Sequence, residues 1–311
     1  MATIKEILKK IDTFENQFQT KVERKLIEER KLELLKHYKG EDEIVSWQDI
    51  ETKVKEAGEP ERLVSGLETF DKELRGGIEV GRLVVLSAGT KSGKTTISID
   101  LMRKYQKYNP CMIVLEQPPE ELIREQLFYG NEIPQIYSPK TFNKVSINWL
   151  EDRILESYLK YGTRVAVIDH LDFIEKDERQ SMRHLQIQSV MEELKLMSRR
   201  LNIAIFLVAH INKLSPEEQP NHFNLAESSS IAKLSDIVLF LWRECVKVNG
   251  KIEYTGLVNL RIDISRQGGT GTDIKLIFNN GKYREADQFE TMDAQQKIDN
   301  AKPKKYGKSN V

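Results

Sequence analysis

Short runs of apolar residues recur through the middle of the chain, and segments with helical spacing lie between them. The apolar runs span residues 83–87, 112–115, 165–168 and 203–208, and the helical patterns span 94–108, 119–128 and 184–201. Runs of this kind suit parallel strands that are buried on both faces of a sheet. Alternation of such strands with helices predicts an α/β domain with a mostly parallel central sheet flanked by helices.

Further strand candidates follow. They span residues 238–242, 256–264 and 274–278, and Gly268-Gly269-Thr270-Gly271 between the last two predicts a hairpin turn. We expect the α/β domain to cover residues 63–290. The remaining residues, 291–311, include Lys302, Lys304, Lys305 and Lys308, and their composition predicts a basic, flexible tail.

The first 62 residues have a different character, because they are highly charged and their apolar residues are sparse. These apolar positions recur three or four residues apart, at Ile4, Ile7, Leu8, Ile11, Phe14, Phe18 and Val22. The spacing predicts an amphipathic helix with a narrow apolar stripe within residues 4–38. It would pack on its own domain or dock on a neighbouring subunit. Residues 40–60 predict a linker with a short turn or helix that contains Trp47.

Charge is balanced, with 48 acidic and 48 basic residues among 311. No overall positive field therefore indicates a polyanionic partner, although a local basic stripe or a ring channel would be hidden in the sum. The two cysteines, Cys111 and Cys245, lack neighbours at zinc-binding spacing, which fits a reducing compartment. We find no signal-peptide pattern and no apolar run near the roughly 18 residues that a membrane span requires. We expect a cytoplasmic protein.

The loop after the first apolar run carries a phosphate-binding pattern. The pattern, a relaxed Walker A motif, consists of Ala88, Gly89, Thr90, Lys91, Ser92, Gly93, Lys94, Thr95 and Thr96. Small residues let backbone N–H groups curl around a phosphate, and the following helix directs its positive end at the anion. Lys94 is expected to reach the β- and γ-phosphates, and the Thr95 hydroxyl to ligate Mg²⁺. The pattern predicts a nucleoside triphosphate site, with ATP and Mg²⁺ as cofactors.

Polar residues follow three other apolar runs, at the strand ends that form the ligand side of an open α/β sheet. Asp169 is the candidate for the carboxylate that holds Mg²⁺ through a water, or else it caps the next loop. Glu116 is the candidate general base, or else a surface residue before a turn. His210 would donate to the γ-phosphate and sense its loss, or else it is only a loop residue.

These residues, in this order, resemble the RecA-like ATPase domain of the replicative hexameric helicases of the DnaB family and its phage relatives. The resemblance begins at residues 65–71 and 76–77, a segment that is also similar to the RadA and KaiC ATPases, and it continues to about residue 286. Glu116 looks like the family's catalytic glutamate, and Asp169 like its Walker B aspartate. His210 resembles the Gln or His with which the family senses phosphate.

The resemblance also implies roles for residues that the pattern alone leaves unassigned. Residues 228–236 look like an element that includes a contact to the DNA strand, and Arg243 resembles a basic residue near the nucleotide base. Arg266 stands where the family places an arginine finger that acts on the ATP of the neighbouring subunit. The family often has a lysine two positions earlier, and here that residue is Ile264. The implied assembly is a homo-oligomer, a hexameric ring, in which residues 4–38 would act as the docking helix.

Two loops would face the channel of such a ring. The first carries Lys176, Arg179 and Arg183, and the second, residues 212–227, carries Lys213. Positive groups there would follow the phosphates of a single strand without reading its sequence. Solvated surface loops remain the alternative, and Glu217 and Glu218 in the second loop oppose a polyanion.

The function implied by the resemblance is an ATP-hydrolysing, ring-forming motor that binds single-stranded DNA and unwinds duplex during replication. RNA stays open as the strand, and a primase or loader is an implied partner. One alternative is a RecA-like or RadA-like recombination or repair ATPase that forms filaments. A second alternative is a KaiC-like regulatory or assembly ATPase that acts on protein partners.

Overall fold

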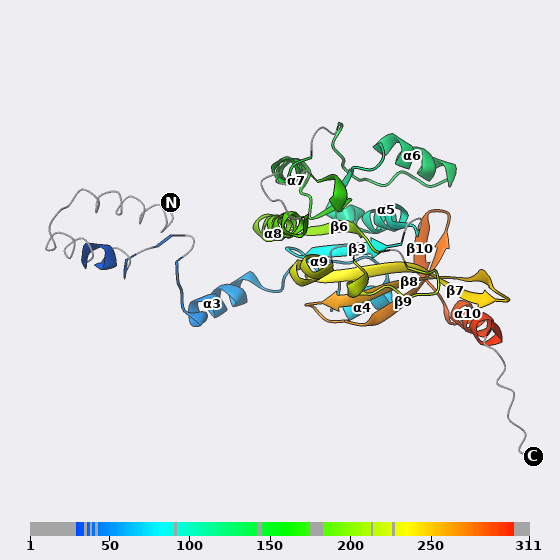
Figure 1. Cartoon of the computed structure of the whole chain (residues 1–311). Helices are drawn as coiled ribbons and strands as arrows, with labels where there is room; N and C mark the ends of the chain where they lie inside the picture. Colours follow the sequence, from blue (N-terminus) through cyan, green and yellow to red (C-terminus); the bar gives the residue numbers. More distant parts are fainter. Residues whose placement is uncertain are drawn as a thin grey trace, which may run out of the picture. The chain divides into compact units, whose positions relative to one another are not determined.

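The structure, a computed structural model, divides the chain into two compact units, Met1–Pro60 and Glu61–Val311 (Figure 1). It describes residues 29–33, 36–37, 39–40, 43–89, 92–141, 145–174, 183–212, 214–225 and 228–301. Most of the helix expected within residues 4–38 lies outside the described residues. In the described part of the chain, no helix is both long enough and apolar enough to cross a bilayer.

Helix α3 (Trp47–Ala57) occupies the segment of the first unit in which the sequence predicts a turn or helix around Trp47. Ser46 begins it with a capping box, because its Oγ accepts from the Asp49 N–H at 3.1 Å and its own N–H donates to the Asp49 carboxylate at 3.2 Å. Trp47, Ile50 and Val54 are exposed at helical spacing. Among its described residues, the first unit therefore buries none of this apolar stripe.

The second unit is built on an eight-stranded sheet with the order β10-β9-β8-β7-β3-β6-β5-β4. Its strands are β3 (Leu83–Ala88), β4 (Cys111–Val114), β5 (Val165–Asp169), β6 (Ala204–His210), β7 (Ile237–Val248), β8 (Lys251–Ser265), β9 (Thr272–Asn279) and β10 (Lys282–Glu285). Strands β7, β3, β6, β5 and β4 run parallel, whereas β8, β9 and β10 pair antiparallel. This sheet confirms the predicted fold class. A separate two-stranded sheet joins β1 (Arg62–Leu63) to β2 (Ile78–Glu79).

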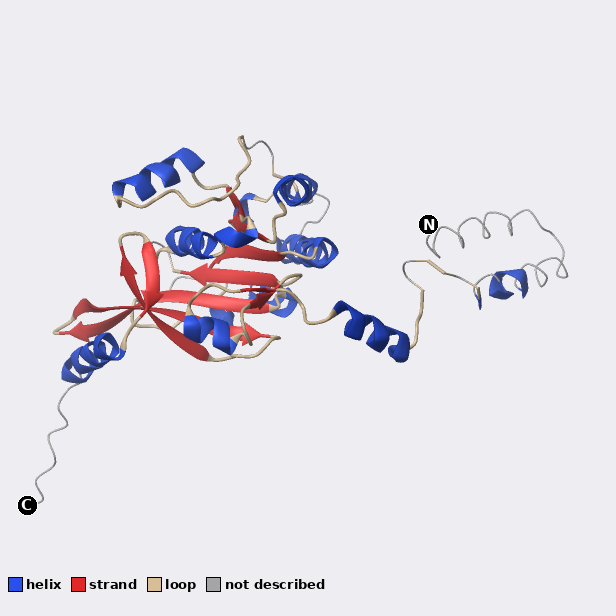
Figure 2. Ribbon diagram, turned by 180° about the vertical axis from the view of Figure 1, so that it is seen from behind, coloured by secondary structure: helices blue, strands red, loops and turns tan. Residues whose placement is uncertain are grey.

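Helices lie on both faces of the sheet, as the two opposite views show (Figures 1 and 2). They are α4 (Glu68–Glu73), α5 (Lys94–Lys104), α6 (Pro119–Phe128), α7 (Ile147–Tyr161), α8 (Arg183–Leu201) and α9 (Ser228–Leu234), with short helices η1 (Gln106–Tyr108), η2 (Leu171–Phe173) and η3 (His222–Asn224). Alternate strand residues enter two separate cores: α4 and α5 pack on one face, and α7, α8 and α9 on the other. Burial on both faces explains why the parallel strands are continuous apolar runs.

The C-terminal region differs from the expected flexible tail, because residues 288–301 form helix α10 (Gln288–Ala301). Asp287 caps it: its carboxylate accepts from the Glu290 N–H at 2.8 Å, and the Glu290 carboxylate accepts from the Asp287 N–H at 3.0 Å. Ala294 is buried, and Lys297 Nζ donates to the Thr255 carbonyl at 3.1 Å. The expectation for residues 291–301 was therefore wrong, although the capping box is legible in the sequence. Residues 302–311, with the tail lysines, lie outside the described residues.

Helix α7 is a second element that the sequence analysis missed. Ser146 begins it by accepting from the Trp149 N–H at 3.2 Å, and Gly162 ends it in the left-handed region with φ 70°. A serine before an apolar pattern and a glycine after it are ordinary helix start and stop signals. Helix α7 covers one face of the sheet through Leu150 and Ile154.

Candidate active site

The ends of four parallel strands bring Lys94, Asp169 and His210 to one edge of the sheet, with Glu116 beside them. In the strand pairing, Ala88 at the end of β3 lies opposite His210 at the end of β6. Likewise, Val114 at the end of β4 lies opposite Asp169 at the end of β5. This carboxyl edge is where an open α/β sheet binds its ligands. We call it the carboxyl edge below, and the opposite edge the amino edge.

The phosphate-binding loop connects β3 to the start of α5. Gly93 has φ 89°, in the left-handed region, and a Cβ there would lie 2.8 Å from the Tyr283 hydroxyl oxygen. A glycine is therefore needed both for the turn and for the close approach of β10. The first N–H groups of α5 lack partners within the helix and face the loop. Thr90 and Lys91 of the predicted motif lie outside the described residues.

The Lys94 side chain lies between the end of β3 and His210. Its Nζ donates to the Ala88 carbonyl at 3.1 Å and lies 3.0 Å from His210 Nδ1. Burial lowers the pKa of Lys94, and the nearby carboxylates of Asp169 and Glu116 oppose that effect. An ammonium group that is partly desolvated and held by exchangeable partners is suited to bind an anion.

Asp169 and Thr95 form the second contact across this edge. Thr95 Oγ1 donates to Asp169 Oδ2 at 2.9 Å. The other carboxylate oxygen, Oδ1, is buried and has no hydrogen-bond partner among the described residues. Burial raises the pKa of the Asp169 carboxyl, while the Thr95 hydrogen bond acts in the opposite direction. An unused carboxylate oxygen beside a hydroxyl is a donor set that fits Mg²⁺.

Glu116 lies at the rim of the site, beyond the end of β4. The preceding residue, Leu115, donates its N–H to the Asp169 carbonyl at 2.6 Å, which ties this segment to β5. The Glu116 side chain is 56% exposed, and its carboxylate is 3.9 Å from His170 Nε2. A carboxylate at the rim with access to solvent is able to accept a proton from a water molecule.

His170 is a residue of this site that the sequence analysis did not assign. Its Nε2 lies 3.2 Å from His210 Nε2, with the ring centroids 4.3 Å apart and the ring planes at 75°. The side chain is buried, and burial lowers the pKa of His170. The sequence feature that could have identified His170 is its place directly after Asp169, at the end of a buried strand. Its contact with His210 depends on the neighbouring positions of β5 and β6.

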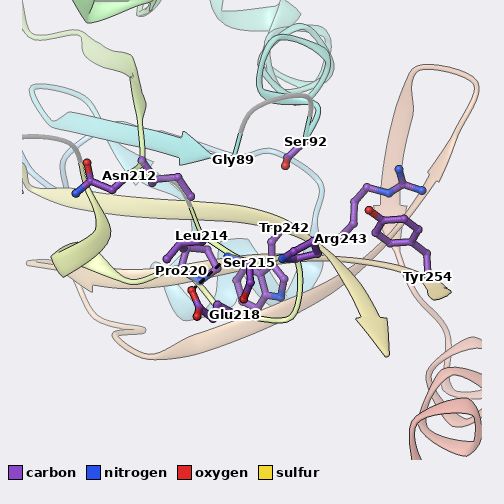
Figure 3. A pocket seen from close by; sticks show the side chains of 12 residues that line it. Gly89, Ser92, Asn212, Leu214, Ser215, Glu218, Pro220, Trp242, Arg243 and Tyr254 are labelled. Carbon is purple, nitrogen blue, oxygen red and sulfur yellow. Dashed lines mark hydrogen bonds between the residues drawn. The ribbon is translucent and has the colours of Figure 1, made fainter. Parts of the chain in front are cut away.

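Hollows flank the phosphate-binding loop on the side of β7 and β8. A cavity of about 690 Å³ is lined by Gly89, Ser92 and Arg243, with Trp242, Tyr254 and residues of the 211–220 segment around them (Figure 3). A smaller one, about 350 Å³, adds Gly93, Thr96 and Tyr283. The Arg243 guanidinium lies over the Tyr254 ring, 4.0 Å from its centroid. The structure thus places Arg243 beside the loop, and it adds Tyr254 and Tyr283, which the sequence analysis did not single out.

Arg266 does not join this cluster. Its N–H donates to the Asp236 carbonyl at 2.9 Å, and the Asp236 N–H donates to the carbonyl of Leu83, the first residue of β3. Arg266 therefore lies at the amino edge. Strand β3 has six residues, so at about 3.3 Å per residue its two ends are roughly 17 Å apart. The Arg266 side chain is 55% exposed, and its Nη2 donates to the Lys233 carbonyl at 3.1 Å.

The candidate DNA-binding residues are described only in part. Lys176, Arg179 and Lys213 lie outside the described residues, and for Arg183 only the backbone, at the start of α8, is described. Both loops nevertheless begin at the carboxyl edge, one after β5 and η2 and the other after β6. In the second loop, His222 donates its N–H to Asp263 Oδ2 at 3.1 Å, which ties η3 to β8.

Together, the mixed sheet, the glycine loop before α5 and the polar strand ends define a RecA-like P-loop ATPase domain. Residues 136–287 match the family described as the DnaB-like helicase C-terminal domain. This part of the chain is thus similar to the DnaB-like helicase C-terminal domain, the family that the sequence resembles.

Curated relatives show the same similarity. The replicative DNA helicase DnaB of Leifsonia xyli subsp. xyli is 23% identical over 278 residues, which cover 78% of this chain and 60% of that protein. The DnaB helicase of Rickettsia bellii is 23% identical over 168 residues, covering 52% of this chain and 30% of that protein. The chain thus spans about three fifths or less of the length of these relatives.

Two solved structures share the fold. The ATPase domain of G40P superposes with a TM-score of 0.67 at 19% identity, covering 79% of this chain and all of that one. A DnaB-like replicative helicase, described with its interactions with primase, superposes with a TM-score of 0.65 at 18% identity, covering 90% of this chain and 75% of that one.

Proposed function

We propose that this protein is an ATP-driven motor that assembles into a ring, most simply a hexamer, and translocates on single-stranded DNA to unwind duplex during replication. The observation that carries the proposal is the meeting of Lys94, Thr95, Asp169 and His210 at one sheet edge, with Glu116 at the rim. The similarity of residues 136–287 to the DnaB-like helicase C-terminal domain supports the same function.

The residues present fit a nucleoside triphosphate with Mg²⁺. The Asp169 carboxylate, which accepts from the Thr95 hydroxyl, has a second oxygen that is buried without a partner among the described residues. The Thr95 hydroxyl and Asp169 would hold Mg²⁺, directly and through a water respectively. Bound there, the ion would neutralise charge that develops on the phosphates.

In this proposal each protein group has a defined task. The N–H groups at the start of α5 and the ammonium of Lys94 bind the phosphates. Lys94 exchanges the Ala88 carbonyl and His210 Nδ1, its present partners, for phosphate oxygens. Glu116 accepts a proton from the attacking water. His210, once Lys94 has left it, faces the γ-phosphate position with Nδ1.

Arg266 would complete the site of a neighbouring subunit. It lies at the amino edge, roughly 17 Å of strand away from the phosphate-binding loop of its own chain. In the proposed head-to-tail ring, the amino edge of one subunit would lie against the carboxyl edge of the next. An arginine supplied in this way would stabilise the transition-state charge and make hydrolysis depend on assembly.

Two further features support assembly and DNA binding. The exposed stripe of Trp47, Ile50 and Val54 on α3 offers an apolar face that a neighbouring subunit would cover, together with the residue 4–38 segment. Lys176, Arg179, Arg183 and Lys213, on the loops that leave the carboxyl edge, would follow the backbone of a single strand. A primase or a loader would be a protein partner of the ring.

Complementation between two inactive variants tests the shared site. Glu116→Gln and Arg266→Ala proteins are each expected to be inactive as ATPases. Mixing them in equal amounts before assembly restores about one interface in four, because a head-to-tail interface takes Glu116 from one subunit and Arg266 from the other. Recovered activity supports the ring. No recovery in mixed assemblies would refute the action of Arg266 on a neighbour.

Two measurements on the wild-type chain test the motor itself. We expect single-stranded DNA to stimulate ATP hydrolysis, and electron microscopy with an ATP analogue and DNA to reveal closed rings. Continuous filaments on DNA would instead support the recombination ATPase. A protein without salt-sensitive DNA affinity would favour the regulatory ATPase.

A further inference from the structure

Three basic side chains converge on one buried carboxylate at the amino edge of the sheet. Asp236 is fully buried, and its Oδ1 lies 3.2 Å from Lys195 Nζ, 3.8 Å from Arg266 Nε and 4.0 Å from Arg82 Nη1. Its other oxygen, Oδ2, accepts from the Leu83 N–H. One negative charge therefore stands among three positive charges, and the distances show that the three cations do not share it equally.

Arg82 has a nearer carboxylate than Asp236. Its Nε donates to Glu79 Oε2 at 3.0 Å, and its Nη2 contacts the same oxygen. The other oxygen of Glu79 pairs with Arg62, whose Nη2 lies 2.7 Å away. Arg82 is thus held by Glu79 and does not compete for Asp236.

Lys195, on α8, holds the position beside Asp236. Its Nζ donates to Asp236 Oδ1 at 3.2 Å and to the Leu234 carbonyl at 2.7 Å. The side chain of Lys195 is only 13% exposed, so solvent and salt screen its attraction to the carboxylate less than they would at the surface. The single charge of Asp236 is therefore used mainly by Lys195.

Arg266 is left without a carboxylate at hydrogen-bond distance. Its Nε is 3.8 Å from Asp236 Oδ1, beyond the range of an N–H···O bond, and its Nη2 donates to the Lys233 carbonyl at 3.1 Å. The side chain is 55% exposed, and its Nη1 has no hydrogen-bond partner among the described residues. The charge of Arg266 is therefore available to an anion that another molecule supplies.

We propose that Lys195 is a positioning residue for Arg266, because by occupying the Asp236 carboxylate it keeps the Arg266 guanidinium from forming an ion pair within its own subunit. This inference rests on the proposed function, in which Arg266 acts on the nucleotide of the neighbouring subunit. Without Lys195, the buried Oδ1 of Asp236 would lack its donor, and Arg266 would be the nearest cation. A guanidinium drawn onto Asp236 would be withdrawn from the phosphates of the neighbour.

Replacement of Lys195 in the full-length chain tests this role. Lys195→Met keeps most of the side-chain length and removes the charge. We expect it to lower kcat for ATP about 10-fold with KM almost unchanged, because the phosphate-binding loop of each subunit is intact. If Lys195→Met does not fold, Lys195→Gln keeps a donor for the Leu234 carbonyl. The matched control is Lys160→Met, which removes an exposed lysine that pairs with Glu156 on α7.

Mixed assemblies separate a role toward the neighbour from a role within the subunit. Mixed equally with Glu116→Gln protein, Lys195→Met should gain about 3-fold over its activity alone, since about one interface in four joins an intact Glu116 to an intact Arg266. Mixed with Arg266→Ala, it should lose about half, because no interface then receives an intact arginine.

Rescue of Lys195→Met by Arg266→Ala, or no gain with Glu116→Gln, would overturn the inference, because the defect would then lie in the subunit's own nucleotide site or fold. If Glu116→Gln and Arg266→Ala fail to rescue each other, the proposed action of Arg266 on a neighbour fails instead.

Urea denaturation without nucleotide tests the competition for Asp236 directly. In the wild type, Arg266→Ala should shift the urea midpoint little, because the half-exposed guanidinium has no close ion pair to lose. In Lys195→Met protein, the same change should lower the midpoint clearly more, because Arg266 then serves as the partner of a buried carboxylate. Equal shifts in the two backgrounds would refute the inference and leave the proposed function standing.

Discussion

Two buried aspartates lie at opposite edges of the same sheet, and they differ in how their oxygens are used. Asp236 precedes β7 at the amino edge. Its Oδ2 accepts from the Leu83 N–H at 3.0 Å, and its Oδ1 accepts from Lys195 Nζ at 3.2 Å. The guanidinium groups of Arg82 and Arg266 lie 4.0 and 3.8 Å from Oδ1. Both carboxylate oxygens of Asp236 therefore have partners, and these contacts join the segments that meet at the amino edge.

Asp169, at the carboxyl edge, has the same residue type and the same degree of burial but fewer partners. Thr95 supplies one hydrogen bond, and Oδ1 has none from the described residues. Burial raises its pKa, which means that the fold holds this carboxylate at a cost. Both aspartates are buried, so burial does not distinguish the two edges. The difference is that Asp169 at the carboxyl edge keeps an oxygen without a partner among the described residues, whereas both oxygens of Asp236 at the amino edge are bonded.

The largest effect on stability should follow from removing the Asp236 carboxylate. Asp236→Ala leaves the cation of Lys195 and the Leu83 N–H buried without their partner, so we expect a loss of about 3–5 kcal/mol in the free energy of unfolding. Urea denaturation measures it, with Asp293→Ala on the exposed face of α10 as the control. A loss no larger than that of the control would mean that Asp236 does not hold the amino edge.

At the carboxyl edge, Lys94→Ala should affect function instead of stability. We expect turnover to fall about 10²–10³-fold, because a preorganised positive group at the phosphates is lost. The melting temperature should stay near that of the wild type. Steady-state ATPase assays and nucleotide titration measure the effect, and Lys107→Ala in η1 is the control. Unchanged nucleotide affinity together with unchanged turnover would remove Lys94 from the site.

Glu116→Gln separates binding from chemistry at the same edge. The amide keeps the size of the side chain but cannot accept the proton of water, so hydrolysis should fall about 10²-fold or more. Affinity for an ATP analogue should change little, since Glu116 lies at the exposed rim. Glu120→Gln, in the first turn of α6, is the control. A matching loss of analogue affinity would point to a binding role.

The smallest effect concerns stability and pH at Asp169. The folded protein holds the proton of this carboxyl more tightly than the unfolded chain does, because its pKa is raised above 3.8. The Asp169 carboxyl therefore lowers the free energy of unfolding as the pH rises from its pKa in the unfolded chain through its raised pKa in the folded protein. Above the raised pKa the loss stays constant. Asp169→Asn should remove this loss, so the variant gains stability relative to the wild type as pH rises.

Denaturant unfolding without nucleotide or Mg²⁺, from about pH 4 to pH 7, resolves this gain. Asp293→Asn serves as the control. A variant that loses stability relative to the wild type over that range would show that the Asp169 carboxylate stabilises the fold. That result would contradict the contrast between Asp169 and Asp236.

Local pattern predicted much of the fold. The apolar runs became β3, β4, β5 and β6 almost residue for residue, because strands buried on both faces allow few polar positions. Helix α6 matches the predicted residues 119–128. Helices α7 and α10 were not predicted, because the sequence marks them only by helix caps and by a weak apolar pattern. Their stability comes from contacts with distant strands, which no local window contains.

What the sequence by itself determined is the phosphate-binding loop. Its strand, glycines and helix start are contiguous, so their geometry follows from local backbone preferences. The tertiary structure decided which strand ends meet. It brought His170 against His210, set Tyr283 of β10 beside Gly93, and put Arg266 at the edge away from the loop. Those relations depend on strand order and pairing across long separations in the chain, which a pattern along the sequence does not encode.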